Sequence, residues 1–169
     1  METIFENTCV DTQEEYYQLF SWLAPKYVRI ASVVFCVIGA IALLAYATGD
    51  LTYLLSGIWL ILSGVYLLLS GRINGKAYYN KKVKVYGETL PPKTYHFFET
   101  HFRVFDVDSD ATIDYSRIKK VGFLKDCIAI MVEPAGVVYT MSNNSFTKGT
   151  LSEFKQFLRV KCPNLTIPE

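Results

Sequence analysis

Two uncharged, mostly apolar runs separated by three residues constrain this chain more than any other feature. They cover residues 30–47 and 51–71, and the break between them is Thr48-Gly49-Asp50. Each run is close to the ~20 residues that a helix needs to cross the ~30 Å hydrocarbon layer of a bilayer. Neither run has the polar face at helical spacing that a soluble core helix would show. Because three residues can join only antiparallel helices, the sequence predicts a transmembrane hairpin over residues 30–71.

The charges around the two runs predict the orientation of this hairpin. Bases precede the first run and follow the second, whereas the turn that connects the two runs carries only an acid, Asp50. Since basic flanks favour the cytoplasmic side, we expect a multi-pass protein of the cell (inner) membrane with both termini in the cytoplasm. The bases that we expect at the surface of the lipid bilayer are Lys26, Arg29, Arg72, Lys76, Lys81, Lys82 and Lys84.

Serine–glycine pairs recur every seven residues in the second run. A step of seven residues returns to the same helix face after two turns, and small residues let another helix approach closely while serines can bond across the contact. The stripe therefore either packs the two spans of one hairpin together or forms a surface for self-association or for another membrane protein. The candidate helix-packing residues are Ser56, Gly57, Ser63, Gly64, Ser70 and Gly71, with Ser32 and Gly39 in the first run.

The segment before the hairpin, residues 1–29, predicts a short strand over 3–10 and then a helix. Thr12 and Glu15 fit a capping box, in which each side chain satisfies a free backbone amide at the helix start. The helix would place Tyr16 and Leu19 on one face. Two interpretations stay open: a helix lying along the membrane interface, or a short helix packed on the soluble domain.

After the hairpin, residues 72–87 predict a basic helix that leaves the membrane, and the Pro91-Pro92 pair marks a boundary. Residues 88–169 predict a small antiparallel β domain, because short β-rich runs alternate with turn signals. A second capping box at Thr150 predicts a terminal helix that covers one end of the sheet. The expected strands are 93–99, 102–106, 111–115, 118–124, 127–132 and 137–141.

Little in the composition indicates nucleic-acid binding or catalysis. Seventeen bases nearly balance sixteen acids, so the chain has no general basic footprint for nucleic acid. His96 and His101 lie beside one predicted turn, but no spacing brings a nucleophile to them. The stretch 106–110 begins like a calcium loop, but Ala111 and Arg117 replace its glycine and its glutamate. The four scattered cysteines indicate reduced thiols, and we expect no metal, no cofactor and no enzymatic activity.

The layout resembles the YcxB-like family of bacterial membrane proteins. The residues that carry the resemblance are 97–99 with 102–104, then 113–121, and above all 146–158. The resemblance implies two spans, a basic exit helix and a pleckstrin-homology-like C-terminal domain, and it implies no enzymatic activity. The chain departs from the family at His101, where glycine is common, and at 142–145, which lack the family's proline and basic residue.

These observations predict a membrane protein that combines a two-helix transmembrane hairpin with a small antiparallel β (pleckstrin-homology-like) domain capped by a C-terminal helix. The leading functional hypothesis is a non-enzymatic scaffold or accessory subunit that binds a protein partner. The alternative is an anionic-lipid-sensing module that uses Lys81, Lys82 and Lys84 with the sheet edge; a membrane enzyme is the weaker alternative. Phosphoinositide binding of the usual pleckstrin-homology kind is disfavoured, because the loop between the first two strands is expected to be only Thr100-His101.

Overall fold

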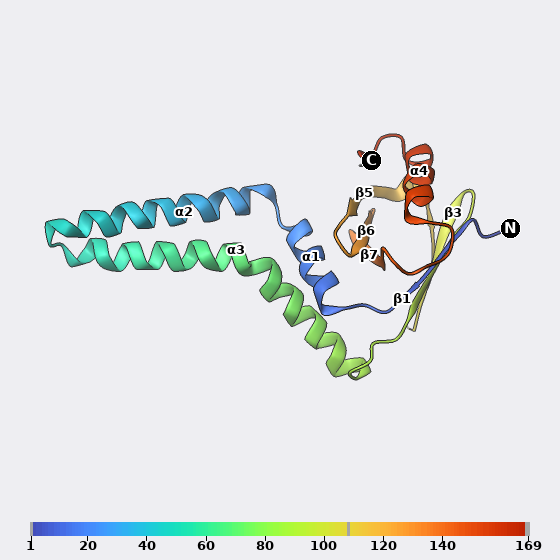
Figure 1. Ribbon diagram of the computed structural model, residues 1–169, viewed down its shortest axis with the longest axis horizontal. Helices are drawn as coiled ribbons and strands as arrows, with labels where there is room; N and C mark the ends of the chain where they lie inside the picture. Colours follow the sequence, from blue (N-terminus) through green and yellow to red (C-terminus); the bar gives the residue numbers. More distant parts are fainter. Residues whose placement is uncertain (1, 108, 168–169) are drawn as a thin grey trace.

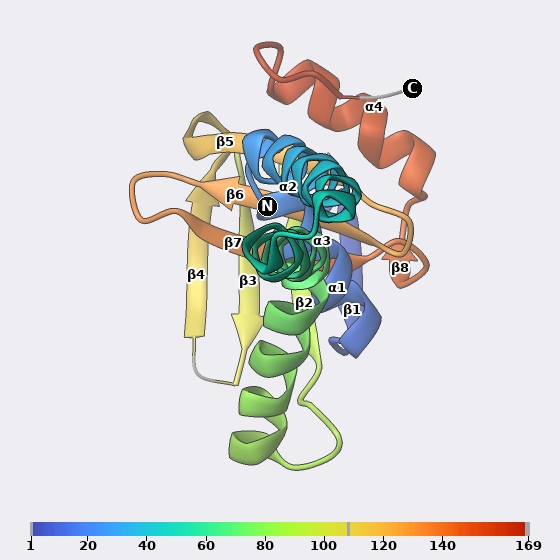
Figure 2. The same cartoon turned by 90° about the vertical axis from the view of Figure 1, so that its left-hand side faces the viewer.

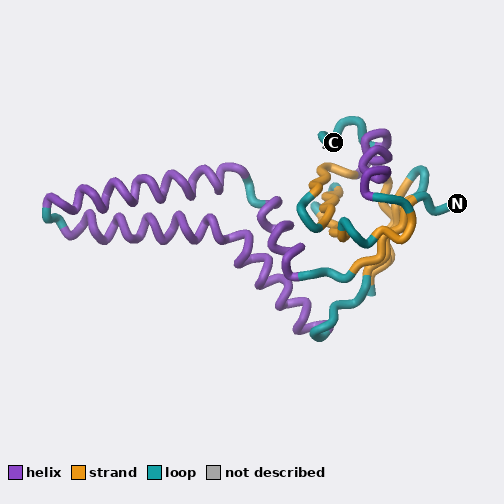
Figure 3. The backbone as a smooth tube through the Cα atoms, viewed as in Figure 1, coloured by secondary structure: helices purple, strands orange, loops and turns teal. Residues whose placement is uncertain are grey.

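The computed structural model describes residues 2–107 and 109–167, and it has a helical hairpin at one end and a two-sheet unit at the other (Figure 1). Figure 3 shows the purely helical part and the strand-rich part side by side. Asp108, in the calcium-like stretch, lies outside the described residues. The helices are α1 (Gln13–Leu23), α2 (Lys26–Ala45), α3 (Leu51–Tyr86) and α4 (Leu151–Lys161). The strands are β1 (Phe5–Cys9), β2 (Lys93–Phe97), β3 (His101–Asp106), β4 (Ser109–Asp114), β5 (Ile118–Phe123), β6 (Cys127–Val132), β7 (Val137–Ser142) and β8 (Phe146–Lys148).

Helices α2 and α3 form the predicted antiparallel hairpin, and both are long and apolar enough to cross a membrane. A single 3₁₀ turn (Tyr46–Thr48) and Gly49, in the left-handed conformation at φ 89°, join them. Asp50 then caps α3, because its side chain accepts a hydrogen bond from the amide of Thr52 at 2.8 Å. In the most apolar stretch of each helix, only 11% of the residues of α2 and 17% of those of α3 are buried. These helices therefore differ from the core helices of a soluble protein, which are mostly buried.

Helix α3 continues without interruption beyond the apolar run, so the predicted basic helix of residues 72–87 is its second half. Figure 1 shows α3 changing direction where it leaves α2 and begins to run alongside α1. The helix ends at Tyr86, and Gly87 follows it with φ 91°, a conformation that residues other than glycine rarely adopt.

The larger sheet takes one of its central strands from the N-terminal segment. Its order is β4-β3-β2-β1-β8, and β1 pairs antiparallel with both β2 and β8. Residues 88–169 therefore do not form the sheet unit by themselves, and the division at residue 88 leaves out β1. The hairpin expected across Thr100-His101 is present as β2 and β3, which residues 98–100 join. In chain order, however, the first two strands of the sheet are β1 and β2, and residues 10–92, with the whole helical hairpin, connect them.

The second sheet has the order β5-β6-β7, and its strands cross those of the larger sheet when the molecule is viewed along the hairpin (Figure 2). The predicted antiparallel architecture is thus present, as two sheets with a shared core. The predicted terminal helix α4 is also present, with both hydrogen bonds of the Thr150 capping box. Its side chains Phe154 and Leu158 are fully buried against core residues such as Phe97. Full burial of each such side chain stabilises the fold by about 1.5–3 kcal/mol.

Helix α1 packs between α3 and the smaller sheet. Its side chains Tyr16 and Leu19 are buried in a small cluster with Ala129 of β6. Trp22, near its end, lies against Gly122 of β5, where an added Cβ would come within 2.5 Å of the indole ring. Of the two interpretations left open by the sequence, the structure therefore has the packed helix.

Candidate functional site

The glycine stripe of α3 lies in direct backbone contact with α2 along the hairpin. A Cβ added at Gly57 would lie 2.9 Å from the carbonyl oxygen of Gly39, and one added at Gly64 would lie 2.8 Å from that of Ser32. Both distances are shorter than real Cβ contacts, so only glycine permits this approach. Gly39 and Ser32 are the two small residues singled out in the first run, and both are buried.

The same stripe then continues along α1, which the sequence did not indicate. A Cβ added at Gly71 would lie 2.6 Å from the Ser21 hydroxyl, and one added at Gly75 would lie 2.8 Å from the Tyr16 carbonyl oxygen. Gly75 was not among the candidate packing residues. The stripe thus packs α3 against two other helices of the same chain.

Two of the stripe serines, Ser56 and Ser70, bond within their own helix. Ser56 donates to the carbonyl of Thr52 at 2.8 Å, and Ser70 donates to that of Leu67 at 2.7 Å. Ser32 of α2 likewise donates to its own turn. The expected bonds across the contact are therefore not made by these serines, because a carbonyl of the preceding turn is always within reach of a helical serine. Ser63, half-buried, lines a groove on the outside of the hairpin with Phe35, Trp59, Leu62, Tyr66 and Leu67.

The bases expected at the membrane surface divide into two groups. Lys26, Arg29, Arg72, Lys76, Lys81 and Lys84 are exposed. Arg29 also donates to the carbonyl of Ser21 at 3.0 Å, which ties the start of α2 to α1. Lys82, in contrast, is half-buried, and its ammonium lies 3.4 Å from the carboxylate of Asp11. The Lys82 side chain is therefore drawn partly toward a buried carboxylate, and its place at the membrane surface stays a prediction.

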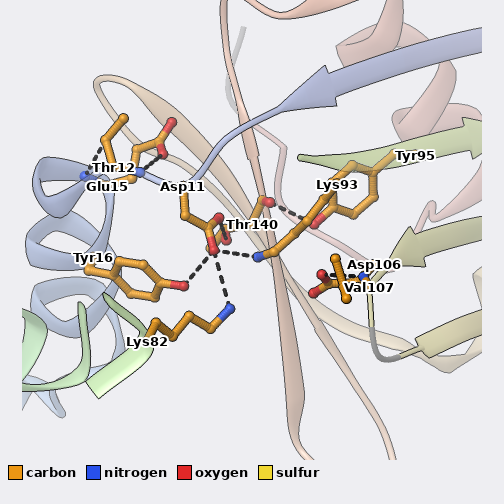
Figure 4. A network of polar contacts seen from close by, with 10 residues as sticks. All are labelled: Asp11, Thr12, Glu15, Tyr16, Lys82, Lys93, Tyr95, Asp106, Val107 and Thr140. Atoms are coloured by element: carbon orange, nitrogen blue, oxygen red, sulfur yellow. Dashed lines mark hydrogen bonds and ion pairs between the residues drawn. The ribbon is translucent and has the colours of Figure 1, made fainter. Parts of the chain in front are cut away.

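Asp11 is the centre of a buried polar network at the junction between the helices and the sheets (Figure 4). One of its carboxylate oxygens accepts from Lys93 of β2 at 2.6 Å and from the hydroxyl of Tyr16 of α1 at 2.5 Å. Lys82 of α3 approaches the same oxygen. The other oxygen accepts from Thr140 of β7 at 3.4 Å. A single side chain thus joins two helices to strands of both sheets.

Burial and neighbouring groups shift the pKa values of Asp11 and Tyr16 in this network. Burial alone would raise the pKa of Asp11, but the charge and hydrogen bond of Lys93, with the Tyr16 hydrogen bond and the charge of Lys82, together hold the pKa of this carboxyl below its usual value. Burial, followed by the charge of Asp11, raises the pKa of Tyr16, so the phenol keeps its proton and donates it. A cavity of about 10 Å³ beside Asp11, Lys82 and Lys93 has room for at most one water. The network therefore has a structural role, holding the helices against the sheets, and the cavity beside it has no room for a substrate.

One pattern in the sequence indicates part of this network. Lys93 starts a strand in which Tyr95 and Phe97 alternate inward, so the lysine also points to the buried face. A buried ammonium needs an anion beside it. Asp11, directly before the Thr12 capping box, is the residue that supplies it. The pairing could not be deduced because β1 and β2 are separated by the entire hairpin.

The histidines and cysteines are held apart from this network or sealed in the core. His96 lies 3.8 Å from the Glu6 carboxylate, and His101 lies beside Thr100. All four cysteines are free, and burial raises the pKa of Cys9 to about 11 and that of Cys127 to about 12. These thiols therefore stay protonated at neutral pH. Within residues 2–107 and 109–167, no three His, Cys, Asp or Glu side chains gather in a way that could hold a metal ion.

Comparisons of the chain with protein-family models, with curated proteins and with solved structures found no match. The resemblance to the YcxB-like family therefore stays a prediction.

Proposed function

We propose that this chain is an integral membrane protein of the cell (inner) membrane, anchored by the α2–α3 hairpin. The observation that carries this proposal is the exposed apolar outside of the hairpin. Val37, Ile41 and Leu62 are 52%, 60% and 63% exposed, whereas the glycines face inward. Removing apolar surface from water is favourable by roughly 25 cal/mol per Å², and a bilayer would cover both helices at once.

The charges support an orientation with both termini in the cytoplasm. Lys26 and Arg29 begin α2, and Arg72 and Lys76 follow the apolar part of α3, so these bases lie at the same end of the hairpin. The opposite end carries Asp50 and no base. This asymmetry matches the preference of basic flanks for the cytoplasmic side.

The two-sheet unit, which we take to be pleckstrin-homology-like, would act as a non-enzymatic scaffold or accessory subunit that binds a protein partner. Two features support this role over catalysis. The unit is tied to the hairpin by two chain connections and by the Asp11 network, so it would be presented at a fixed orientation to the membrane. The cavity beside that network is too small for a substrate. Lipid sensing through Lys81, Lys82 and Lys84 is less well supported, because Lys82 pairs with Asp11.

Extraction of membranes at alkaline pH tests the anchoring. The full chain should stay in the pellet. The double variant Ile41→Lys/Leu62→Lys should be released or degraded, since each lysine in a span costs about 2.5–3.5 kcal/mol of insertion free energy. The matched variant Val137→Lys/Val160→Lys changes exposed residues of the sheet unit and should behave like wild type. A wild-type chain in the soluble fraction would contradict the anchoring.

Native mass spectrometry of the full chain, purified in a mild detergent, tests the scaffold role. We expect a complex with a second polypeptide at fixed stoichiometry. A chain that is always monomeric, or that associates only with itself, would contradict this role.

A further inference from the structure

Beside the crossing of α1 and α3 lies a groove of about 450 Å³ that is not part of the Asp11 network. It is lined by Glu14 and Tyr17 of α1 and by Arg72, Ile73 and Lys76 of α3. The groove exists because Gly71 and Gly75 let the two helix backbones touch, which leaves the longer side chains to form walls beside the contact. The groove therefore depends on the close contact between α1 and α3 at Gly71 and Gly75.

The two cations in this groove are available for a ligand. Arg72 and Lys76 are four residues apart, so they lie on the same face of α3. Neither makes a hydrogen bond or an ion pair with any residue in the part of the chain that the structure describes, and both are exposed. This distinguishes them from Lys82, whose charge is used by Asp11, and from Arg29, which donates to the Ser21 carbonyl.

The position of the groove along α3 indicates which anion it would meet. Arg72 is the first charged residue after the apolar run that ends at Gly71, so it lies where the proposed span leaves the hydrocarbon. Tyr17 supplies an aromatic ring of the kind enriched at this level of a membrane. An arginine beside a lysine matches a phosphate, because the guanidinium can donate two parallel hydrogen bonds and the ammonium adds a point charge.

We propose that this groove is a binding site for one anionic phospholipid, with its phosphate between Arg72 and Lys76. The inference rests on the proposed anchoring, because it needs the groove at the bilayer surface. The charge balance fits: two bases and the carboxylate of Glu14 give the lining a net charge of +1, which complements a phosphodiester of charge −1. The lipid's acyl chains would leave the groove along the apolar outside of the hairpin.

Lipid retention measured by native mass spectrometry tests this site. The full chain would be reconstituted in nanodiscs of phosphatidylcholine alone or of phosphatidylcholine and phosphatidylglycerol in equal parts, and the bound lipid would be counted after release. We expect one retained phosphatidylglycerol per chain. Arg72→Gln and Lys76→Gln should each lower retention about fivefold, since a basic residue near an anionic surface contributes on the order of this factor. Glu14→Gln, which removes the negative charge of the lining, should retain the lipid at least as well as wild type.

The matched control removes the same charge outside the groove. Lys26→Gln/Lys84→Gln alters two exposed bases that do not line it, so it should weaken only the diffuse attraction to the surface and lower retention less than Arg72→Gln/Lys76→Gln does. Equal losses in the control and in Arg72→Gln/Lys76→Gln would overturn the site in favour of diffuse attraction to the surface. Loss of retention in Glu14→Gln would also overturn it. These results would leave the anchoring intact if the chain still resists alkaline extraction, whereas a soluble chain would refute both.

Discussion

Replacing Asp11 by asparagine removes one charge from the centre of the junction and keeps the shape of the side chain. Its side chain is only 5% exposed, and the side chain of Lys93, 2.6 Å away, is 11% exposed. Asp11→Asn would therefore leave a buried ammonium without its anion. Removing one partner of a buried pair costs about 3–5 kcal/mol. Because Lys82 can turn toward solvent, we expect the lower end, ~3 kcal/mol, and a fall in Tm of roughly 6–12 °C for a chain of this size.

Thermal unfolding of the full chain in detergent, followed by near-ultraviolet circular dichroism, measures this change. Lys93→Met in the Asp11→Asn background should restore most of the lost stability, because a buried pair can be replaced by apolar groups at little net cost. The matched control is Asp110→Asn, which breaks the exposed Arg103–Asp110 pair at 2.6 Å and should cost under ~1 kcal/mol. An Asp11→Asn variant as stable as the control, or a double variant whose losses simply add, would refute the role of the network.

The remaining predictions concern pH, packing and chain connectivity. The folded state lowers the pKa of Asp11, so the ionised carboxylate stabilises the fold fully above its unfolded pKa of about 4, and this stabilisation is lost as pH falls through its folded pKa. The difference in unfolding free energy between wild type and Asp11→Asn should therefore shrink in acid. A difference that does not change with pH would contradict an ionised Asp11. Gly64→Ala should lower the free energy of unfolding in detergent by about 1–3 kcal/mol, because the added methyl group overpacks the contact between α2 and α3. Val65→Ala, on the outside of the hairpin, should not lower it by this amount. Equal losses would show that α2 and α3 do not touch closely at Gly64. Residues 88–169 alone should stay unfolded by circular dichroism because β1 is missing, and a peptide of residues 2–12 should restore strand content; a folded fragment would refute the place of β1.

The hairpin and the helix starts could be predicted from the sequence because their signals are local. Two apolar runs with a three-residue break leave few alternatives, and the Thr12 and Thr150 capping boxes each lie within four residues. The strands after residue 92 were also predicted closely, and 127–132 was predicted exactly. The short β8 was missed, because three residues carry little periodicity.

The junction could not be predicted because it depends on contacts between distant segments. β1 was recognised as a strand, but nothing local indicates that it pairs with β2 across residues 10–92. Once that pairing is known, Asp11 and Lys93 must lie close together, since Asp11 comes two residues after the end of β1 and Lys93 is the first residue of β2. The ion pair of Lys82 with Asp11 depends on the same arrangement of distant segments. From the sequence alone, a run of bases predicts a solvated helix face, because nothing local indicates that a buried acid lies beside one of them.

The central claim, a hairpin that spans a membrane with the sheet unit on the cytoplasmic side, is tested most directly by cysteine labelling in intact cells. The four native cysteines would be replaced by alanine, and single cysteines introduced as Asp50→Cys in the hairpin turn or as Asn144→Cys in the exposed loop before β8. A membrane-impermeant maleimide should label Asp50→Cys from outside and should label Asn144→Cys only after the cells are broken. Labelling of Asn144→Cys in intact cells, or protection of Asp50→Cys until lysis, would contradict the account.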